Sequence, residues 1–403
     1  MNILFISPWY PLPPDNGAKL RISSLLSALC SRHRVMFIAA HHPAVQPVPP
    51  QGVLSQCESV IPVPWLPKPV TGLARWLSFL WPRPAWVFFA LSSEMQQAIV
   101  SAVNPSNFDL IITYELSTLA YLPAYARVPV ILEDVELGGY LKEDQATGFL
   151  ARLRRGLFVW KVRRVLRSTL PRLAGCTVPS AAEHTLLQRL VPHLPPVEII
   201  PNCLADAHYT DVAAHPEPET LIFTGALTFR ANYEAVSYFL EKIYPLIKRE
   251  LPGVRFCITG RNEGIPLPLA EQDPSVTMTG FVDDVYPLIA NSWLSVVPLL
   301  TGGGTRFKIL EALALGTPVV ATSKGAEGLT LESGKHLLIA DEPEAFAAAV
   351  VRLCRDSALR ARLSEAGRKV IFAEHTWQSV APRYLAWVEQ IAGNTVTNHG
   401  GTI

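Results

Sequence analysis

The sequence predicts an α/β protein with two doubly wound domains, in which helices cover both faces of a mainly parallel sheet. Three observations support this prediction: short apolar runs alternate with helical stretches, a polar stretch interrupts the alternation once, and the chain has 403 residues. A single core seldom grows beyond about 250–300 residues, so two domains are expected. With 49% hydrophobic and 17% charged residues, the chain is too apolar to be disordered.

The first half contains five runs that read as buried strands, because each is short, rich in β-branched or aromatic residues and bounded by turn residues. They span residues 2–7, 33–40, 109–115, 128–134 and 175–180. Helical periodicity is expected between them, at 19–29 and 92–103. This order predicts parallel strands connected by helices.

A second series of strands follows the polar stretch at 211–220. These runs span residues 220–225, 254–260, 276–280, 294–300 and 318–322, and several end in glycine. We therefore predict a first domain over 1–202, a linker over 203–219 and a second domain over 220–376. The final helix, at about 377–391, is a candidate to pack back on the first domain, because it has apolar residues at helical spacing.

One loop of the second domain, TGGGTRFK, stands out because Gly302, Gly303 and Gly304 directly precede a helix. Glycine costs roughly 1 kcal/mol per helical residue relative to alanine, so the triplet must serve backbone access instead. The spacing predicts a helix over 305–315, with Gly316 as its left-handed cap. Backbone N–H groups at the start of a helix favour a phosphate or another anion.

The same helix places Lys308 and Glu311 three residues apart on one face. Two interpretations stay open for this pair. The first is a surface ion pair worth about 0.2–0.5 kcal/mol beside a tight turn. The second is a ligand site at the carboxyl end of the parallel sheet, where α/β proteins bind their ligands. The loop after the first strand, with Gly17 at the start of its helix, is a second candidate for anion binding.

At this point the sequence resembles the GT-B glycosyltransferases, specifically the family 4 enzymes that use nucleotide sugars. The matching pieces lie in the family's order along almost the whole chain, and the last is the most specific. They are SPWYPLPPDNGAKLR (7–21), VEIIPN (197–202), FTGALTFRANYEAVSYFL (223–240), TGFVDDVYPLIANSWLSVVPL (279–299) and GGGTRFKILEALALGTPVVATSKGAEGL (302–329). This resemblance implies two Rossmann-like domains facing a central cleft.

The resemblance further implies a retaining transfer of a sugar from a nucleotide diphosphate donor. The donor would bind mainly to the C-terminal domain, and a glycan or lipid-linked acceptor of envelope or exopolysaccharide assembly mainly to the N-terminal one. No cofactor and no tightly bound metal are expected. Glu311 matches the glutamate that binds the ribose. The other donor-binding candidates are Gly17, Arg230, Asn232, Phe281, Val282, Gly302, Gly303, Gly304, Thr305, Arg306 and Lys308.

The chain departs from the family at Gly303, which occupies the position of the first glutamate of the E-x7-E motif. In many relatives that carboxylate touches the transferred sugar. A protein that binds nucleotide sugars but has lost transfer is therefore an alternative. A two-domain small-molecule receptor is weaker, because it does not explain Glu311. A nicotinamide dehydrogenase is weaker still, because no G-x-G-x-x-G follows the first strand.

Acidic residues at two strand ends have open interpretations. Glu133 and Asp134 end the run at 128–134 and are candidates for catalysis or acceptor binding, with capping of the following helix as the alternative. Asp283 and Asp284 are expected to cap the helix after residue 284. The six cysteines show no metal-ligand spacing and are expected to be buried thiols of a reducing compartment.

Charge and targeting features suggest a cytoplasmic protein. The net charge is +1, so nucleic acid is not an expected partner. The start of the chain lacks a basic leader and reads as a strand, and prolines interrupt the most apolar stretch. Residues 149–175 contain eight basic residues and no acidic one. They are either a surface helix packed on its own sheet or a peripheral contact with the inner face of an anionic membrane.

Overall fold

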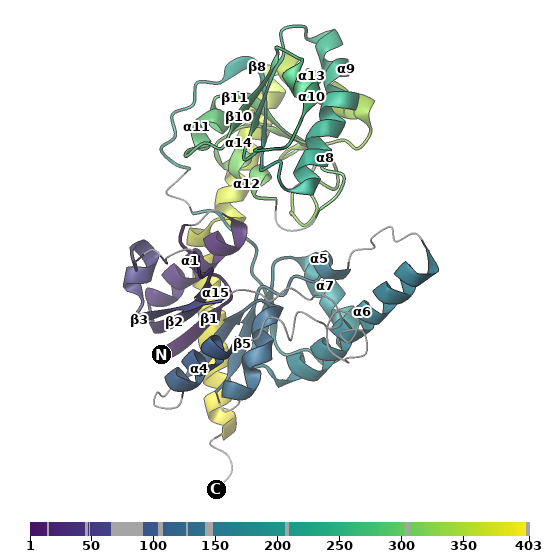
Figure 1. The fold of residues 1–403 in the computed structure, drawn as a ribbon. Helices are drawn as coiled ribbons and strands as arrows, with labels where there is room; N and C mark the ends of the chain where they lie inside the picture. The colour runs from purple at the N-terminus through teal and green to yellow at the C-terminus, as the bar shows by residue number, and fades with distance from the viewer. Residues whose placement is uncertain are drawn as a thin grey trace. The chain divides into compact units, whose positions relative to one another are not determined.

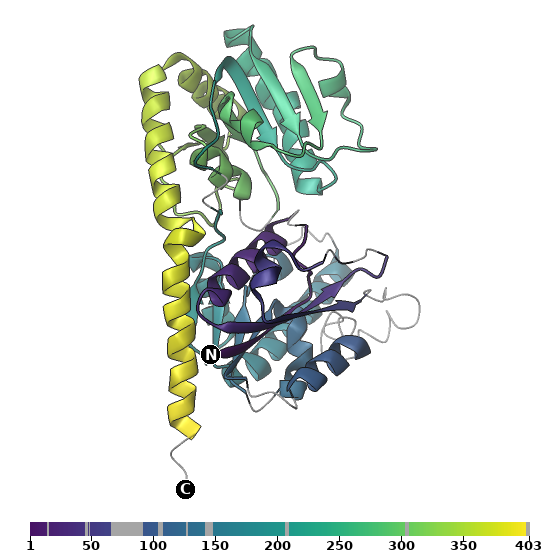
Figure 2. The same cartoon turned by 90° about the vertical axis from the view of Figure 1, so that its left-hand side faces the viewer.

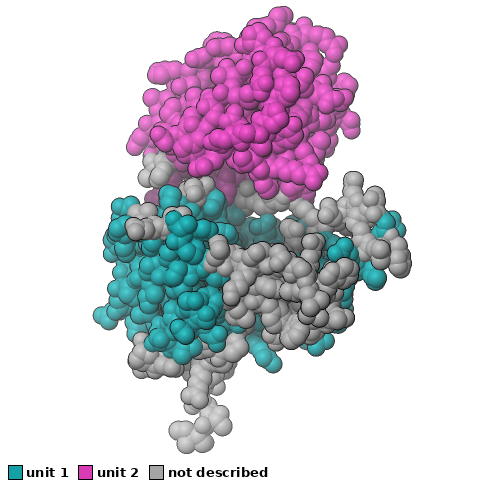
Figure 3. All heavy atoms as spheres, viewed as in Figure 1, with its two compact units in different colours: residues 1–202, 381–403 teal, residues 203–380 magenta. Residues whose placement is uncertain are grey.

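The computed structural model describes residues 1–13, 16–44, 47, 49–65, 92–103, 108–125, 128–141, 148–205, 209–302 and 306–399. The chain divides into two compact units (Figure 3). Unit 1 consists of Met1–Asn202 and Ala381–Ile403, and unit 2 is Cys203–Val380. The first division therefore falls where the sequence suggested the start of the linker, and the second falls inside the final helix.

Unit 1 contains a seven-stranded sheet in the order β3-β2-β1-β4-β5-β6-β7, in which all neighbouring strands are parallel (Figure 1). Its strands are β1 (Asn2–Ser7), β2 (Arg34–His41), β3 (Ser59–Pro64), β4 (Leu110–Tyr114), β5 (Val130–Glu133), β6 (Gly175–Val178) and β7 (Val197–Ile199). All the strands expected in this half are present. The sequence missed only the two edge strands, β3 and β7.

The helices of unit 1 begin and end at recognisable residues. They are α1 (Gly17–Cys30), η1 (Gly52–Gln56), α4 (Ser93–Val103), η2 (Leu116–Tyr125), α5 (Gly138–Leu141), α6 (Phe149–Thr169), η3 (Leu170–Arg172) and α7 (Ala181–Leu190). The Asn16 side chain caps α1 by accepting from Lys19 N at 3.1 Å. The Ser180 hydroxyl caps α7 in the same way.

The last helix, α15 (Trp377–His399), is a single long helix (Figure 2). Within unit 1 it buries apolar side chains, including Tyr384 and Val388. Trp387 packs near β6, because a Cβ added at Gly175 would lie 2.9 Å from its ring. The C-terminal helix is therefore part of the structure of unit 1.

Unit 2 contains a six-stranded sheet in the order β10-β9-β8-β11-β12-β13, again with parallel neighbours. Its strands are β8 (Glu217–Thr224), β9 (Arg255–Thr259), β10 (Val276–Gly280), β11 (Ser292–Val297), β12 (Val319–Ala321) and β13 (Leu338–Ile339). Its helices are α8 (Arg230–Tyr238), η5 (Phe239–Ile243), α9 (Tyr244–Glu250), α10 (Pro268–Glu271), α11 (Tyr286–Ala290), α12 (Phe307–Ala314), α13 (Pro343–Arg355) and α14 (Ser357–Glu374). Two parallel α/β sheets confirm the predicted fold class.

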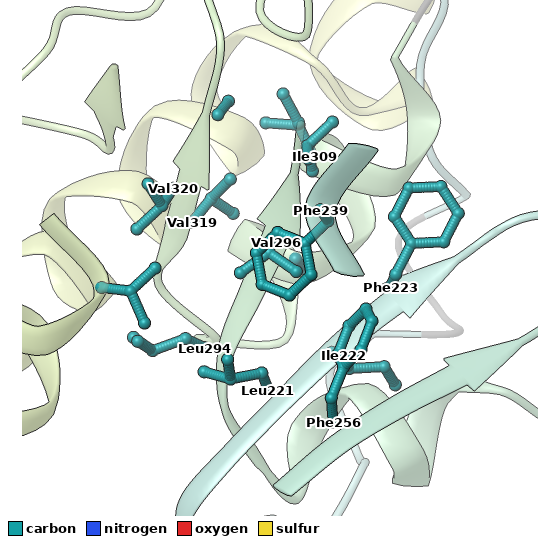
Figure 4. Close-up of a cluster of buried hydrophobic side chains, with 14 of the residues drawn as sticks. Leu221, Ile222, Phe223, Phe239, Phe256, Leu294, Val296, Ile309, Val319 and Val320 are labelled. Carbon is teal, nitrogen blue, oxygen red and sulfur yellow. The ribbon is translucent and has the colours of Figure 1, made fainter. Parts of the chain in front are cut away.

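The core of unit 2 fills the space between its sheet and helices. Figure 4 shows Phe223 of β8, Phe256 of β9 and Val296 of β11 with Ile309 of α12. These side chains are almost completely buried. Strands that bury both faces have continuous apolar runs, and for this reason most strands of this sheet could be predicted from the sequence.

Helix α12 begins two residues later than the sequence predicted. It runs from Phe307, and Arg306 is its N-cap. Its end agrees with the prediction, because Gly316 has a φ of 80° and donates its N–H to Leu313 O at 3.0 Å. Ile309, Leu310 and Leu313 of this helix are fully buried. The core therefore fixes which face of α12 remains for Lys308 and Glu311.

Candidate functional site

Lys308 of α12 is held by two neighbours within unit 2. Its Nζ donates to Asn232 Oδ1 at 2.8 Å and lies 3.9 Å from the centre of the Phe223 ring. Burial, aided by the Arg306 charge, lowers the pKa of Lys308 to about 7. A bound anion would favour the protonated amine, so this position suits a negatively charged ligand.

Two glycines allow the Lys308 amine to reach this position. Gly225, after β8, has a φ of 146°, and a Cβ there would lie 2.7 Å from Asn232 Nδ2 and 3.0 Å from Lys308 Nζ. Gly260, after β9, has a φ of 129°, and a Cβ there would lie 2.5 Å from the Gly225 carbonyl. The sequence showed that several strands end in glycine, but it did not connect these two glycines with Lys308.

Glu311 lies on the same helix face and has different partners. Its Oε1 accepts from the Tyr209 hydroxyl at 3.4 Å, and Tyr209 contacts the Tyr286 hydroxyl at 3.3 Å. The two tyrosine rings are 4.8 Å apart. Burial raises the pKa of Glu311, while the Tyr209 hydrogen bond and the Lys308 charge oppose this effect. The sequence did not indicate the contact between Tyr209 and Glu311, because Tyr209 lies in the stretch expected to be a linker.

Arg306 has a supporting position. Only 5% of its side chain is exposed, and its Nη2 donates to Gly302 O at 3.2 Å and Lys324 O at 3.1 Å. It therefore connects the glycine loop to the segment after β12. Gly302 has a φ of 97°, which favours glycine. Gly303, Gly304 and Thr305 lie outside the described residues.

The two candidates on α8 occupy different environments. Arg230 is 90% exposed and forms a 2.6 Å ion pair with Glu234, which also accepts from Thr301 at 2.8 Å. Asn232 instead points to the Lys308 amine and donates its Nδ2 to Ala226 O at 2.9 Å. The structure thus brings Asn232 and Lys308 together and leaves Arg230 on the surface.

A pocket of about 520 Å³ lies beside the loop after β10. It is lined by Asp211, Val212, Val282, Asp283, Asp284, Val285 and Tyr286. Asp284 accepts from Tyr286 N at 2.9 Å and so contacts the first residue of α11, although the N-cap itself is Val285, which makes no side-chain cap bond. Phe281 is exposed, and the Arg261 guanidinium lies 5.0 Å from its ring centre. Tyr286 links this pocket to Glu311 through Tyr209.

In unit 1, Glu133 is completely buried at the end of β5. Its Oε2 accepts from the Thr177 hydroxyl at 2.6 Å and lies 3.7 Å from Arg21 Nη2. Arg21 also donates to Ile200 O at 2.9 Å and Asn202 Oδ1 at 3.0 Å. Burial raises the pKa of Glu133, and the Arg21 charge opposes this effect. The Glu133 carboxylate is therefore held inside unit 1.

In the described residues, Glu183 rather than Asp134 accepts from the first N–H groups of the next helix, so the capping interpretation is wrong for Asp134. The Asp134 carboxylate accepts from the Tyr114 hydroxyl at 2.7 Å. The N–H groups at the start of α5 instead donate to Glu183, from Leu137 at 2.7 Å and Gly138 at 2.9 Å. A residue 46 positions away supplies the cap, which no local pattern could indicate.

A further carboxylate at this edge, Glu115, was missed. Glu115 follows β4 with a φ of 65°, next to Asp134 with a φ of 61°. Its Oε1 accepts from the indole N–H of Trp9 at 2.8 Å, and 43% of Trp9 is exposed. Burial raises the pKa of Glu115 to about 7 against the Trp9 hydrogen bond, and nearby Asp134 and Glu136 reinforce the rise. Helix α1 begins at Gly17 as predicted, on the same sheet edge.

No cluster of three or more His, Cys, Asp or Glu in the described ranges is suited to hold a metal ion. No described helix is both long and apolar enough to span a membrane.

Comparisons with known proteins show which fold the chain shares and which family matches part of it. Residues 218–356 match the family described as Glycosyl transferases group 1. A sucrose-phosphate synthase from Thermosynechococcus elongatus has a TM-score of 0.71 at 18% identity, covering 98% of this chain and 99% of its own. Anabaena HepE, solved with UDP and glucose, has a TM-score of 0.63 at 15% identity, covering 97% of this chain and 100% of its own. The fold is therefore the GT-B fold that the resemblance implied, and residues 218–356 of this chain match a glycosyltransferase family.

At the level of particular proteins the similarity is partial. A phosphatidyl-myo-inositol mannosyltransferase of Mycobacterium leprae is 34% identical over 121 residues, which are 29% of this chain and 32% of that protein. The chain spans about a third of the length of the curated relatives it matches. The family match contains Lys308, Glu311 and Asn232, whereas Tyr209 lies before it. Membership of family 4 stays a prediction.

Proposed function

We propose that the protein is a retaining glycosyltransferase of family 4 that takes its sugar from a nucleotide diphosphate donor. The observation that supports this most directly is the pair on α12, where Lys308 and Glu311 meet Asn232 and Tyr209. This geometry contradicts a solvated surface ion pair. A cation and a ribose-binding carboxylate on one helix face match the two polar parts of such a donor.

In this proposal each part of the site has one role. The Lys308 amine binds the diphosphate, and Glu311 accepts hydrogen bonds from the ribose hydroxyls. The glycines at 302–304 allow the diphosphate to approach the start of α12, where the helix N-terminus adds positive potential. Arg306 holds the loop through its bonds to Gly302 and Lys324. These groups would supply the charge without a tightly bound metal, and the reaction needs no other cofactor.

The pocket beside Val282 would receive the nucleobase. It is connected to the ribose site because Tyr286 lines it and also contacts Tyr209. HepE, which shares the fold, was solved in complex with UDP-glucose. We therefore take UDP-glucose as the first donor to test on this chain.

Transfer would break the bond between the anomeric carbon and the diphosphate oxygen. A bond from the acceptor oxygen to the same carbon would form on the same face, the acceptor would lose a proton, and the nucleoside diphosphate would leave. We propose that unit 1 binds the acceptor at the edge that contains Trp9 and Glu115. The M. leprae relative is named for transfer to phosphatidyl-myo-inositol, and the acceptor proposed here is likewise a glycan or lipid-linked envelope or exopolysaccharide precursor.

We further propose a cytoplasmic location with peripheral contact between α6 and the inner face of the membrane. Two half-exposed apolar side chains support this proposal, because 60% of Leu153 and 49% of Trp160 are accessible. Arg152, Arg163 and Arg164 are also exposed on this helix. Basic and apolar side chains together favour adsorption to anionic lipid.

The test of transfer combines binding with turnover. UDP-glucose, UDP-N-acetylglucosamine, GDP-mannose and ADP-glucose are screened by thermal shift, since a ligand at 100 times its Kd adds about 2.7 kcal/mol. The donor that binds is then supplied with a membrane lipid extract, and the release of nucleoside diphosphate and a glycosylated product is measured. Binding without turnover would favour the alternative suggested by Gly303, a protein that binds nucleotide sugars and does not transfer them. No binding by any donor would reject both.

A further inference from the structure

Two cysteines of unit 1 meet in space, although they are far apart in the sequence. Cys30 is the last residue of α1, and Cys57 directly follows η1. Their Sγ atoms are 3.7 Å apart. Both are free thiols and both are half-buried, so the expectation of buried thiols is wrong for this pair.

The contact between the two thiols follows from the pairing of β2 with β3. Strand β2 leads away from the end of α1 and pairs with β3, with Met36 opposite Ser59. This register places the residue two positions before Ser59 beside the start of β2. The Cys57 N–H is fixed by Leu54 O at 3.3 Å, and the Cys57 Sγ lies 3.9 Å from Val53 O. The two thiols are therefore neighbours because of sheet pairing.

The contact makes the two sulfur atoms chemically unequal. The hydrogen bond from Cys57 lowers the pKa of the Cys30 thiol, while the same contact raises the pKa of Cys57. The thiolate is the nucleophile in disulfide exchange. Cys30 is therefore suited to attack an external disulfide, and Cys57 is suited to resolve the mixed disulfide that results.

We propose that Cys30 and Cys57 form a reactive dithiol that closes to an intramolecular disulfide by exchange with a low-molecular-weight disulfide such as oxidised glutathione. The Cys30 thiolate attacks one glutathione sulfur, forms a mixed disulfide and releases one glutathione thiolate. Cys57 loses its proton and attacks the Cys30 sulfur, which releases the second glutathione. The two protein thiols are oxidised, and one glutathione disulfide is reduced to two glutathione molecules.

Formation of the Cys30–Cys57 disulfide would connect the end of α1 to the segment that leads into β3. The crosslink constrains the unfolded chain between two positions that the native sheet already holds together, so it is expected to stabilise unit 1. Helix α1 also supplies Arg21, which contacts Glu133 and Asn202. The dithiol would therefore let the thiol–disulfide balance alter the stability of unit 1. This inference is independent of glycosyl transfer.

The experiment uses the full chain, reduced and desalted, and incubated with oxidised glutathione. After alkylation of the remaining thiols, intact mass and peptide mapping are expected to show a Cys30–Cys57 crosslink, two fewer alkylated thiols and no retained glutathione. Thermal unfolding of the crosslinked protein is expected to shift upward by about 3–8 °C. The Cys57→Ser variant is expected to stop at a glutathione adduct on Cys30, and the control Cys257→Ser is expected to crosslink normally.

Phenylarsine oxide provides a second measurement that needs no variant. A trivalent arsenical bridges two close thiols, so it is expected to protect Cys30 and Cys57 together from alkylation. A glutathione adduct that persists on wild-type Cys30, a crosslink between other cysteines, or full alkylation after both treatments would overturn the proposal.

Discussion

The surroundings of Lys308 favour the binding of an anion to its amine. Its amine is held by one amide oxygen and one aromatic face, and neither partner carries a negative charge. Burial and the Arg306 charge lower its pKa to about 7 against the effect of Glu311, so the amine is only partly protonated near neutral pH. A diphosphate would supply the missing counter-charge, which is the physical reason to expect strong coupling between this residue and the ligand.

Replacement of Lys308 by methionine is therefore expected to weaken donor binding. A hydrogen bond to a charged group contributes about 1.5–3 kcal/mol, so the dissociation constant should rise roughly 10- to 100-fold. Titration calorimetry with the donor that binds measures this change. Arg230→Met is the matched control, because that arginine is exposed and paired with Glu234. Equal losses in both variants would contradict the assignment of Lys308.

Glu115 predicts a pH dependence of stability. Its pKa is about 7 in the folded protein, compared with an ordinary value of 4.5 for an exposed glutamate in the unfolded chain. Between these values the folded state binds more protons, so the contribution of Glu115 to stability falls as pH rises from about 4.5 to 7. The Glu115→Gln variant should remove this fall. Its stability relative to wild type should therefore rise between pH 4.5 and 7.5 in urea titrations, and a constant difference would contradict the assigned shift.

The position of the Lys308 amine depends on the elements around α12. Helix α12 is fixed by its buried face, and β8 and β9 end in Gly225 and Gly260 with left-handed backbone. The two turns approach so closely that a side chain at either position would collide with backbone or with the Lys308 amine. The lysine position is thus a property of three elements together.

Substitution of Gly225 by alanine tests this arrangement. The new Cβ would displace Asn232 and Lys308 and would occupy a strained backbone conformation, which costs about 1–3 kcal/mol. We expect lower stability in chemical denaturation together with weaker donor binding. Gly264→Ala is the control, since it also has positive φ but no atom within 4 Å of the added Cβ. If the control lost as much affinity as Gly225→Ala, the close approach at Lys308 would not be the cause.

Helix α6 has different roles along its length. Val162, Val165 and Leu166 are buried, as the packing interpretation required. Leu153 lies nine residues, or two and a half turns, before Val162 and is therefore on the opposite face, as is Trp160. The Arg164 guanidinium lies 5.7 Å from the Trp160 ring centre. The apolar side chains of α6 therefore lie on two faces of the helix, and one of these faces is exposed to solvent.

Flotation with phosphatidylglycerol vesicles tests the exposed face. We expect binding at low salt, loss of binding at high salt, and no binding to phosphatidylcholine, because each basic residue contributes about 1 kcal/mol near an anionic surface. The Leu153→Ser, Trp160→Ser double variant should bind less well. Leu269→Ser, at an exposed leucine of unit 2, is the control. Absence of the protein from floated anionic vesicles at low salt would reject the contact.

At the scale of the molecule, the chain leaves unit 1 after Asn202 and returns at Ala381. The returning part of α15 contributes Tyr384, Leu385 and Val388 to the buried residues. Burial and the Glu133 charge raise the pKa of Tyr384, so the helix meets the buried polar network of unit 1. The core of unit 1 is therefore complete only when the returning part of α15 is present.

Truncation after residue 380 is expected to destabilise unit 1 far more than unit 2. Loss of several buried side chains typically costs about 2–5 kcal/mol each. Hydrogen exchange should show faster exchange in β5 and β6, while β8 and β11 keep their protection. Removal of residues 395–403 alone is the control. Equal loss of protection in both units would mean that the two units do not unfold separately.

The sequence by itself determined most of the sheets, because buried parallel strands are continuous apolar runs. It also placed Lys308 and Glu311 on one face, since helical spacing is local. It missed β3, whose run SVIPVP contains two prolines, and β7 and β13, which have three and two residues. A short strand exists only through pairing with its neighbour, so its own residues are too few to specify it.

Only the tertiary structure decided which residues surround the predicted pair. Tyr209 and Glu311 are 102 positions apart, and Lys308 and Asn232 are 76 apart. Such contacts depend on strand order and on how deeply each helix packs, which no local spacing encodes. The same reason explains why Glu183 caps α5 and why Cys30 meets Cys57. The sequence specified the elements and their faces, and long-range packing selected the partners.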